Sequence, residues 1–103
     1  MKLRFTKQAR IAFLQIVDIF VEYAGQRRAN LFIEKTNQCG NKLLKYPHIG
    51  HPEELLADRK RLYRTISINS NYRLIYHVTS TTIWIVDVWD RRRDPLKLTT
   101  RIK

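Results

Sequence analysis

Residues 71–95 read NYRLIYHVTSTTIWIVDVWDRRRDP, and this stretch carries the strongest strand pattern of the chain. Two segments within it, residues 72–78 and 83–89, are dense in Ile, Val, Tyr and Trp, which pack well on a pleated sheet. A short polar link joins them, and three consecutive arginines follow the second segment at residues 91–93. The stretch therefore predicts two buried strands that end in a cationic cluster on a rigid scaffold.

The chain before this stretch predicts a strand followed by two helices. Residues 1–6 alternate apolar and cationic side chains, as a short strand does, and Thr6 can cap a following helix. Apolar residues recur at helical spacing over 7–24 and again over about 26–44, with Gly25 as a stop between them. Helices joined so tightly form an antiparallel hairpin. The first helix is so apolar that it either lies deep between other elements or offers part of its surface to a partner, and burial is the commoner case.

A further hairpin is predicted where residues 62–68 alternate in polarity and meet the strand that follows the link 69–71. Its register decides which side chains share a face. If only the last two link residues form the turn, Arg64, Arg73 and His77 lie on one face. A three-residue loop turns one strand over relative to the other, and the sequence leaves both registers open.

These elements predict an α+β fold. It comprises an N-terminal strand, an antiparallel helical hairpin, and a mostly antiparallel three-stranded meander that forms one sheet packed by the helices. A chain of 103 residues is expected to form a single domain spanning 1–103, because separate cores rarely occur in chains so short. Residues 53–61 are expected to form a surface loop or short turn after the irregular segment 46–52, and residues 96–103 a short strand or helix.

The charge balance is strongly basic. Twenty Lys and Arg against nine Asp and Glu give a formal charge of +11, which predicts an anionic partner: nucleic acid first, an acidic protein second. A membrane partner is disfavoured, because the basic residues are spread along the chain and no run approaches the ~18 apolar residues of a membrane span. The single cysteine, Cys39, fits a reducing cytoplasm, where we expect the protein to stay.

Arginines form the strongest candidate for chemistry. Guanidinium groups match phosphate oxygens, and several on neighbouring strands can bind a nucleic-acid backbone and stabilise a phosphorane-like transition state without a metal. The candidates for catalysis are Arg64, Arg73, Arg91, Lys97 and His77, and those for nucleic-acid contacts are Arg59, Lys60, Arg61, Arg92, Arg93 and Trp89. The competing interpretation is a set of unrelated surface arginines paired with Asp87, Asp90 and Asp94.

A group for proton transfer is harder to identify. His77 can act as a general base, although a lone histidine in a strand is more often structural. Cys39, His48 and His51 do not match the spacing of zinc ligands, so we expect no metal and no cofactor. Cys39 is expected to be a buried structural thiol on the apolar face of its helix.

The order of elements and several motifs resemble the RelE/ParE superfamily of bacterial type II toxin–antitoxin toxins. The motifs are YPHIG at 46–50, LYR at 62–64, NYRLIY at 71–76, and the ending at 86–95. The resemblance covers nearly the whole chain. It implies a small α+β fold in which a helical hairpin packs on a mostly antiparallel sheet, and an acidic, partly disordered antitoxin that wraps and neutralises the protein.

The resemblance also implies two kinds of activity, because the superfamily contains ribosome-dependent endoribonucleases and inhibitors of DNA gyrase. The nucleases cut mRNA by attack of the 2′-hydroxyl on the adjacent phosphate. Carrying over the RelE-like pattern places Arg64 at a basic catalytic position, Arg73 at the phosphate-binding arginine and Arg91 at the arginine after the last strand. The chain departs from that pattern at Ile66, where the pattern has lysine, and at Lys97, which falls near the catalytic tyrosine.

The leading hypothesis is a metal-independent, ribosome-associated mRNA endonuclease (an mRNA interferase) that arrests growth. In it, Arg73 and Arg91 bind the scissile phosphate, Arg64 supports them, and Lys97 or His77 transfers the proton. Two alternatives stay open: an inhibitor of DNA gyrase, and a catalytically inactive protein that binds the antitoxin and represses transcription with it.

Overall fold

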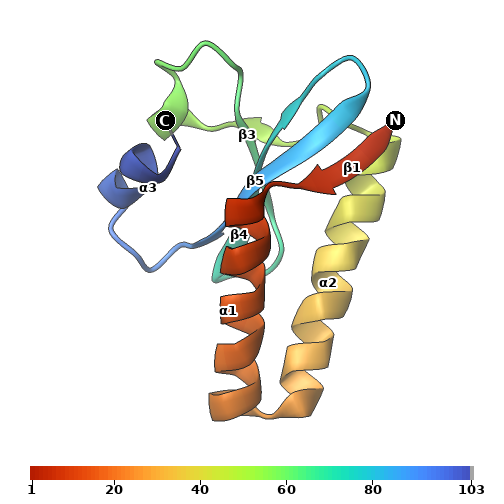
Figure 1. Ribbon diagram of the computed structural model, residues 1–103, viewed down its shortest axis with the longest axis vertical. Coiled ribbons are helices and arrows are strands. Elements are labelled where there is room, and N and C mark those ends of the chain that lie inside the picture. The colour runs from red at the N-terminus through yellow and green to blue at the C-terminus, as the bar shows by residue number, and fades with distance from the viewer. Residues whose placement is uncertain (103) are drawn as a thin grey trace.

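The computed structural model describes residues 1–102; Lys103, the last residue of the predicted tail, lies outside them. The elements follow in the order β1 (Lys2–Phe5), α1 (Lys7–Ala24), α2 (Gln26–Lys45), β2 (His51–Pro52), the 3₁₀ turn η1 (Glu54–Leu56), β3 (Arg64–Ser67), β4 (Tyr72–Val78), β5 (Thr82–Asp90) and α3 (Leu96–Arg101) (Figure 1).

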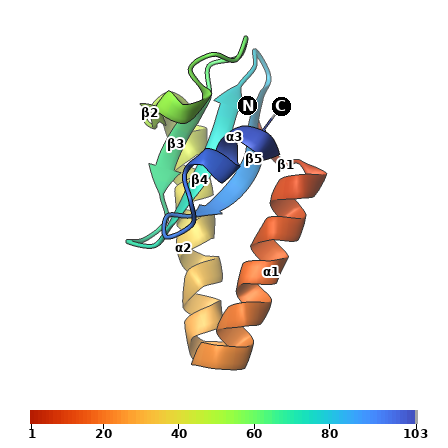
Figure 2. The ribbon, with the colours of Figure 1, turned by 90° about the vertical axis from the view of Figure 1, so that its left-hand side faces the viewer.

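The strands form one sheet of five strands in the order β1-β5-β4-β3-β2. β1 runs parallel to β5, and the other neighbouring strands are antiparallel. The predicted α+β fold, with a helical hairpin packed on this sheet, is confirmed (Figures 1 and 2). The structure adds one strand, because His51 and Pro52, which the sequence placed in an irregular segment, pair with β3 at the edge of the sheet.

The helical hairpin begins and turns at the residues that the sequence indicated. The hydroxyl of Thr6 accepts a hydrogen bond from the N–H of Ala9 (3.2 Å) and caps α1. Gly25, at a φ of 94°, makes the turn into α2, a conformation that L-residues with a side chain rarely adopt. Phe20 of α1 then stacks on Phe32 of α2, with ring centroids 5.1 Å apart.

α1 is not buried deep between other elements, which was the commoner of the two expected cases. Its buried residues are Ala9, Ala12 and Ile16, whereas Leu14 and Ile19 are 53% and 52% exposed. The sheet and α2 cover only one side of the helix, so several apolar side chains on its other side remain in solvent. Part of the apolar surface of α1 is therefore exposed.

Two apolar clusters cover the two faces of the sheet. The helical hairpin packs against Tyr72, Leu74, Tyr76 and their neighbours on one face. On the other face, η1 and α3 pack through Leu56 and Leu98 on Ile75, Val86 and Trp89. Figure 1 shows α2 and α3 on opposite sides of the sheet. We call these the hairpin face and the α3 face.

The register between β3 and β4 is that of a three-residue loop, residues 69–71. Ile68 N–H donates to the Tyr72 carbonyl (2.9 Å), and Arg64 pairs with Tyr76 across the strands. Directly paired residues point to the same side of a sheet. Arg64 therefore belongs to the hairpin face, whereas Arg73 and His77 belong to the α3 face. The loop length thus separates residues that the alternative two-residue turn would have placed together.

Candidate functional site

Arg73 points toward the α3 face and is already paired with an internal anion. Its guanidinium donates to the carboxylate of Glu53, and only 16% of the Arg73 side chain and 5% of the Glu53 side chain are exposed. Glu53 is held in place because its N–H donates to the Tyr63 carbonyl (2.8 Å) and its carboxylate accepts from the N–H of Leu55 (3.4 Å). Among residues 1–102, the buried Nε of Arg73 has no hydrogen-bond partner.

Arg91 lies at the same end of the sheet as Arg73. It is exposed just beyond β5, and its guanidinium donates to the hydroxyl of Ser67. Ser67 is the cross-strand partner of Arg73. Arg91 therefore contacts the residue that pairs with Arg73 across the strands.

The next two arginines are partly engaged within the protein. Arg92 donates through Nε and Nη2 to the two carboxylate oxygens of Asp90 (2.9 and 3.0 Å) and through Nη2 to the hydroxyl of Tyr72 (3.1 Å). These hydrogen bonds from Arg92 lower the pKa of Asp90. The guanidinium of Arg93 lies 4.9 Å from the ring centroid of Trp89. The basic ending is thus a mixed surface, and Asp90 offsets part of its charge.

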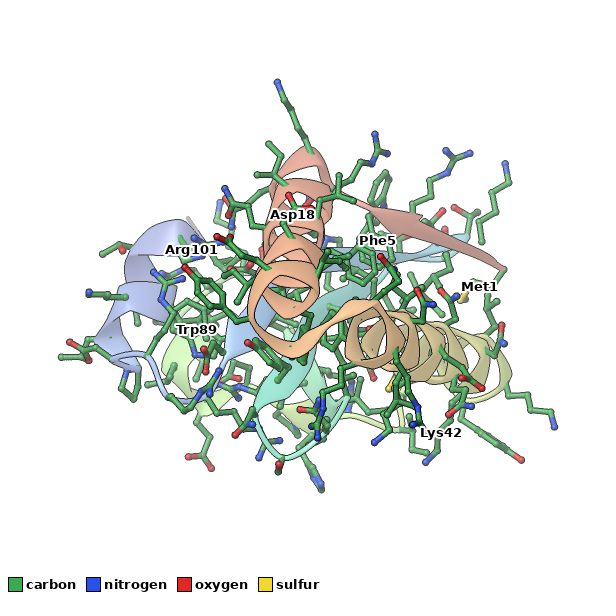
Figure 3. The ribbon with its side chains drawn as sticks, turned by 90° about the horizontal axis from the view of Figure 1, so that it is seen from below. Met1, Phe5, Asp18, Lys42, Trp89 and Arg101 are labelled. Carbon is green, nitrogen blue, oxygen red and sulfur yellow. The ribbon has the colours of Figure 1, made fainter. Side chains whose placement is uncertain are left out.

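Trp89 is a core residue. Its side chain is 1% exposed, and Arg101 of α3 lies 5.8 Å from its ring centroid (Figure 3). Arg101 also donates to both oxygens of the fully buried Asp87 (2.7 and 2.9 Å). A ring buried in this way has no free face for a nucleic-acid base. Trp89 therefore serves to dock α3 on the sheet, contrary to its predicted role.

The predicted basic run at residues 59–61 divides into three environments. Arg59 donates to the carbonyls of Thr99 (2.6 Å) and Ile102 (2.8 and 3.1 Å), so it fixes the end of α3. Lys60 is exposed. Arg61 is exposed too, but its guanidinium reaches His77. Lys97 is exposed on α3.

Arg64 does not join Arg73. Its Nη1 donates to the carbonyls of His48 (3.2 Å) and Gly50 (2.8 Å), on the other face of the sheet. Gly50 packs so closely that a Cβ there would lie 2.6 Å from the hydroxyl of Tyr76, which explains the glycine. Arg64 therefore anchors the segment between α2 and β2.

His77 is buried on β4 and lies beside Arg61. Its side chain stands edge-on to Tyr63, and its Nε2 lies 3.1 Å from Nη1 of Arg61. A guanidinium can only donate, so Nε2 accepts and the proton of the neutral ring is on Nδ1. Burial first, and then the charge of Arg61, lower the pKa of His77.

The protein is expected to become less stable as the pH is lowered, because His77 is buried in its neutral form. Its pKa in the folded chain lies below the unfolded value of about 6.5, so its contribution is complete above that pH and is lost as the pH falls through the folded pKa. Urea unfolding between pH 8 and 5 should show a shallower pH dependence for His77→Gln than for the wild type. His51→Gln, which removes an exposed ring from β2, is the control. Equal slopes for wild type and His77→Gln would contradict the assignment.

The predicted residues therefore form two separate groups. Arg91 contacts Ser67 on the α3 face, and Ser67 is the cross-strand partner of Arg73. Arg61 and His77 lie toward the other end of β4, where Arg64 also lies. Phosphoryl transfer at one phosphate needs its cations and its proton-transfer group within hydrogen-bond reach of that phosphate. The contacts of the described residues do not bring Arg73 and Arg91 together with Arg64 or His77.

Sequence reasoning missed one of the two buried acidic residues that pair with arginines, Glu53. Asp87 did carry a signal, because it is the only charged residue within residues 83–89, and a buried charge requires a partner. Glu53 carried no such signal, since it lies in a polar segment where most carboxylates are solvated. Its burial against Arg73 depends on how the chain returns from β2 to β3.

Two features are absent from residues 1–102. In that part of the chain, no three side chains of His, Cys, Asp or Glu are grouped so as to hold a metal ion. None of the helices there is both long and apolar enough to span a membrane. The thiol of Cys39 is half-buried and contacts the carbonyl of Ser67 (3.3 Å), and burial raises its pKa.

Comparison with known proteins places the chain in a family. Residues 3–95 match the family described as "ParE toxin of type II toxin-antitoxin system, parDE". No curated protein matches the sequence significantly.

Several solved structures share the fold. A chromosomal ParDE toxin–antitoxin system from P. aeruginosa is 18% identical, with 87% of this chain and 95% of that chain covered and a TM-score of 0.71. A YoeB/ParE toxin from Agrobacterium tumefaciens is 19% identical, with 88% and 99% covered and a TM-score of 0.60. A YoeB dimer from Staphylococcus aureus is 22% identical, with 84% and 92% covered and a TM-score of 0.57.

These structural likenesses concern the fold alone, whereas the family match spans most of the chain. It confirms the resemblance seen in the motifs. The chain therefore belongs to the ParE family of toxins of type II toxin–antitoxin systems, and membership in that family implies a cognate antitoxin.

Proposed function

We propose that this toxin inhibits DNA gyrase by binding to it and does not cut mRNA. Of the two activities known in the superfamily, gyrase inhibition needs no group for proton transfer. One observation carries the proposal: Arg64 lies on the opposite face of the sheet from Arg73 and Arg91. A nuclease of the RelE-like pattern would need the three to act on one phosphate.

The environments of the other candidate catalytic residues also argue against mRNA cleavage. Glu53 already neutralises Arg73. His77 is 5% exposed and lies near Arg61, at a distance along β4 from Arg73. Lys97 is exposed on α3, and among the described residues no side-chain hydrogen bond joins it to the arginines. The surface instead offers what a protein partner requires, with exposed apolar side chains on α1 and a large positive charge.

The proposal is tested with purified full-length toxin in two parallel assays. Toxin added to gyrase, relaxed plasmid and ATP is expected to reduce supercoiling, and prior addition of the antitoxin should restore it. The same toxin added to translating ribosomes should leave the mRNA intact by primer extension. Cleaved mRNA together with normal supercoiling would refute the proposal.

Arg91→Gln separates the two activities in cells. A nuclease that uses this arginine on the scissile phosphate would lose about 10²–10³-fold in rate. We expect growth arrest by the variant to match that of the wild type, because the exposed side chain contacts only Ser67 among the described residues. Matching urea-unfolding midpoints would verify that the variant folds normally.

mRNA cleavage is the second candidate, and one observation favours it. Arg91 contacts Ser67, the cross-strand partner of Arg73, so both arginines belong to one end of the sheet. Loss of growth arrest in Arg91→Gln, together with cleavage of ribosome-bound mRNA by the wild type, would favour this function.

The antitoxin is expected to be acidic, because a toxin of charge +11 gains affinity and association rate from a partner of opposite charge. An adjacent reading frame should encode it. A neighbouring frame with a basic product would contradict this expectation.

A further inference from the structure

A small hollow lies near the end of β4, away from Arg73 and Arg91. It has a volume of about 210 Å³, and the residues that line it are His48, Arg61, Leu62, Arg64, His77, Val78 and Thr79. The lining therefore includes two arginines and two histidines. Among the described residues, no carboxylate belongs to this lining.

The two arginines reach the hollow from positions that the fold fixes. Arg64 is immobilised by the carbonyls of His48 and Gly50, both of which accept from the same nitrogen, Nη1. Arg61 contacts His77 through its own Nη1. A guanidinium carries five N–H donors. Within residues 1–102, the Nε and Nη2 groups of both arginines have no hydrogen-bond partner, so each arginine keeps donors for a ligand.

The two arginines of this hollow differ from Arg73, Arg92 and Arg101 in that no carboxylate among residues 1–102 neutralises them. Glu53 neutralises Arg73, Asp90 neutralises Arg92, and Asp87 neutralises Arg101. No such carboxylate pairs with Arg61 or Arg64 in the part of the chain that the structure describes. The hollow is therefore a place where positive charge is concentrated and not balanced by the chain itself.

We propose that this hollow binds a phosphate group between the guanidinium groups of Arg61 and Arg64. Arginine is suited to this ligand, because its planar fork matches two oxygens of a tetrahedral anion. The volume is sufficient, since a water molecule takes about 30 Å³ of liquid and a phosphate group is only a few times larger. The proposal does not depend on gyrase inhibition.

His77 provides an internal reporter of binding. The charged and titratable groups around it are Arg61, Arg64 and His48 in the hollow, with Tyr63 against one side of its ring and Trp84 opposite it on β5. A bound anion offsets the charge of Arg61, which now lowers the pKa of His77. Binding is therefore expected to raise that pKa.

The experiment is a titration of full-length toxin with inorganic phosphate, followed through the imidazole NMR signals of His77. Wild type should show a saturable shift. Sulfate, which does not titrate near neutral pH, should raise the pKa of His77. Arg61→Gln is expected to weaken phosphate binding about 10- to 100-fold, the effect of losing a charged hydrogen-bond donor.

Lys60→Gln is the matched control, because it removes one positive charge from the neighbouring exposed residue, which does not line the hollow. It should bind phosphate as the wild type does. Equal weakening by the two variants, or the absence of a saturable shift at His77 in the wild type, would overturn the proposal.

The source of the phosphate is distinguished by two further ligands. Adenosine 5′-monophosphate presents a terminal phosphate, and a dinucleoside monophosphate presents only an internal phosphodiester. Tighter binding of the monophosphate identifies a site for small phosphorylated molecules. Tighter binding of the dinucleotide identifies a contact for a nucleic-acid backbone.

Discussion

Glu53→Ala is expected to lower the free energy of unfolding by about 3–5 kcal/mol, because it leaves a buried charge without its partner. Arg73 keeps only 16% of its side chain in solvent, so water replaces the lost carboxylate poorly. Its Nε already has no partner among the described residues. Urea unfolding at pH 7, with circular dichroism as the signal, measures the loss.

Two comparisons show whether this loss comes from the ion pair. Glu54→Ala removes an exposed carboxylate one residue further along and should cost well under about 1 kcal/mol. Glu53→Leu combined with Arg73→Met should recover much of the stability, since buried ion pairs are often replaced by apolar pairs at little cost. Equal losses for Glu53→Ala and Glu54→Ala would show that the pair contributes little.

Trp89→Ala is expected to destabilise the protein by a similar amount, about 3–5 kcal/mol. The indole is 1% exposed and lies in the cluster that holds η1 and α3 on the sheet. Its removal leaves a cavity beneath α3 and deprives Arg93 and Arg101 of the ring that they lie over. Urea unfolding measures the global effect, and amide hydrogen exchange in α3 measures the local one.

Trp89→Phe serves as the conservative variant for this prediction, and Tyr23→Ala serves as the control at an exposed aromatic residue. Phenylalanine fills part of the cavity and keeps an aromatic face for the arginines, so it should cost less than alanine. Tyr23 is 80% exposed at the end of α1, and its truncation should leave stability nearly unchanged. If Trp89→Ala is as stable as Tyr23→Ala, the indole is not the support of α3.

Much of the architecture could be predicted from local pattern. Apolar periodicity located both long helices, and Thr6 and Gly25 marked their boundaries because a cap and a turn have specific chemical requirements. The burial of α1 was predicted less well. Periodicity shows which side of a helix is apolar, but the extent of its cover depends on how many elements pack against it.

The candidate site was harder to predict, because it depends on contacts between distant segments. Residue type identified the arginines correctly as a source of positive charge. It could not tell which of them meet carboxylates, since Glu53 is twenty positions from Arg73 along the chain. Nor could it tell that Trp89 is covered by α3, an element that the sequence left as either a strand or a helix.

The loop at 69–71 has a consequence for how such a toxin can change during evolution. Deleting one codon there would exchange the two sides of β3 relative to β4. Arg64 would then share the α3 face with Arg73 and lie opposite His77, while Ile66 would leave the apolar cluster under the helices. A single deletion would therefore change which charged side chains share a face, at the cost of one apolar side chain under the helical hairpin.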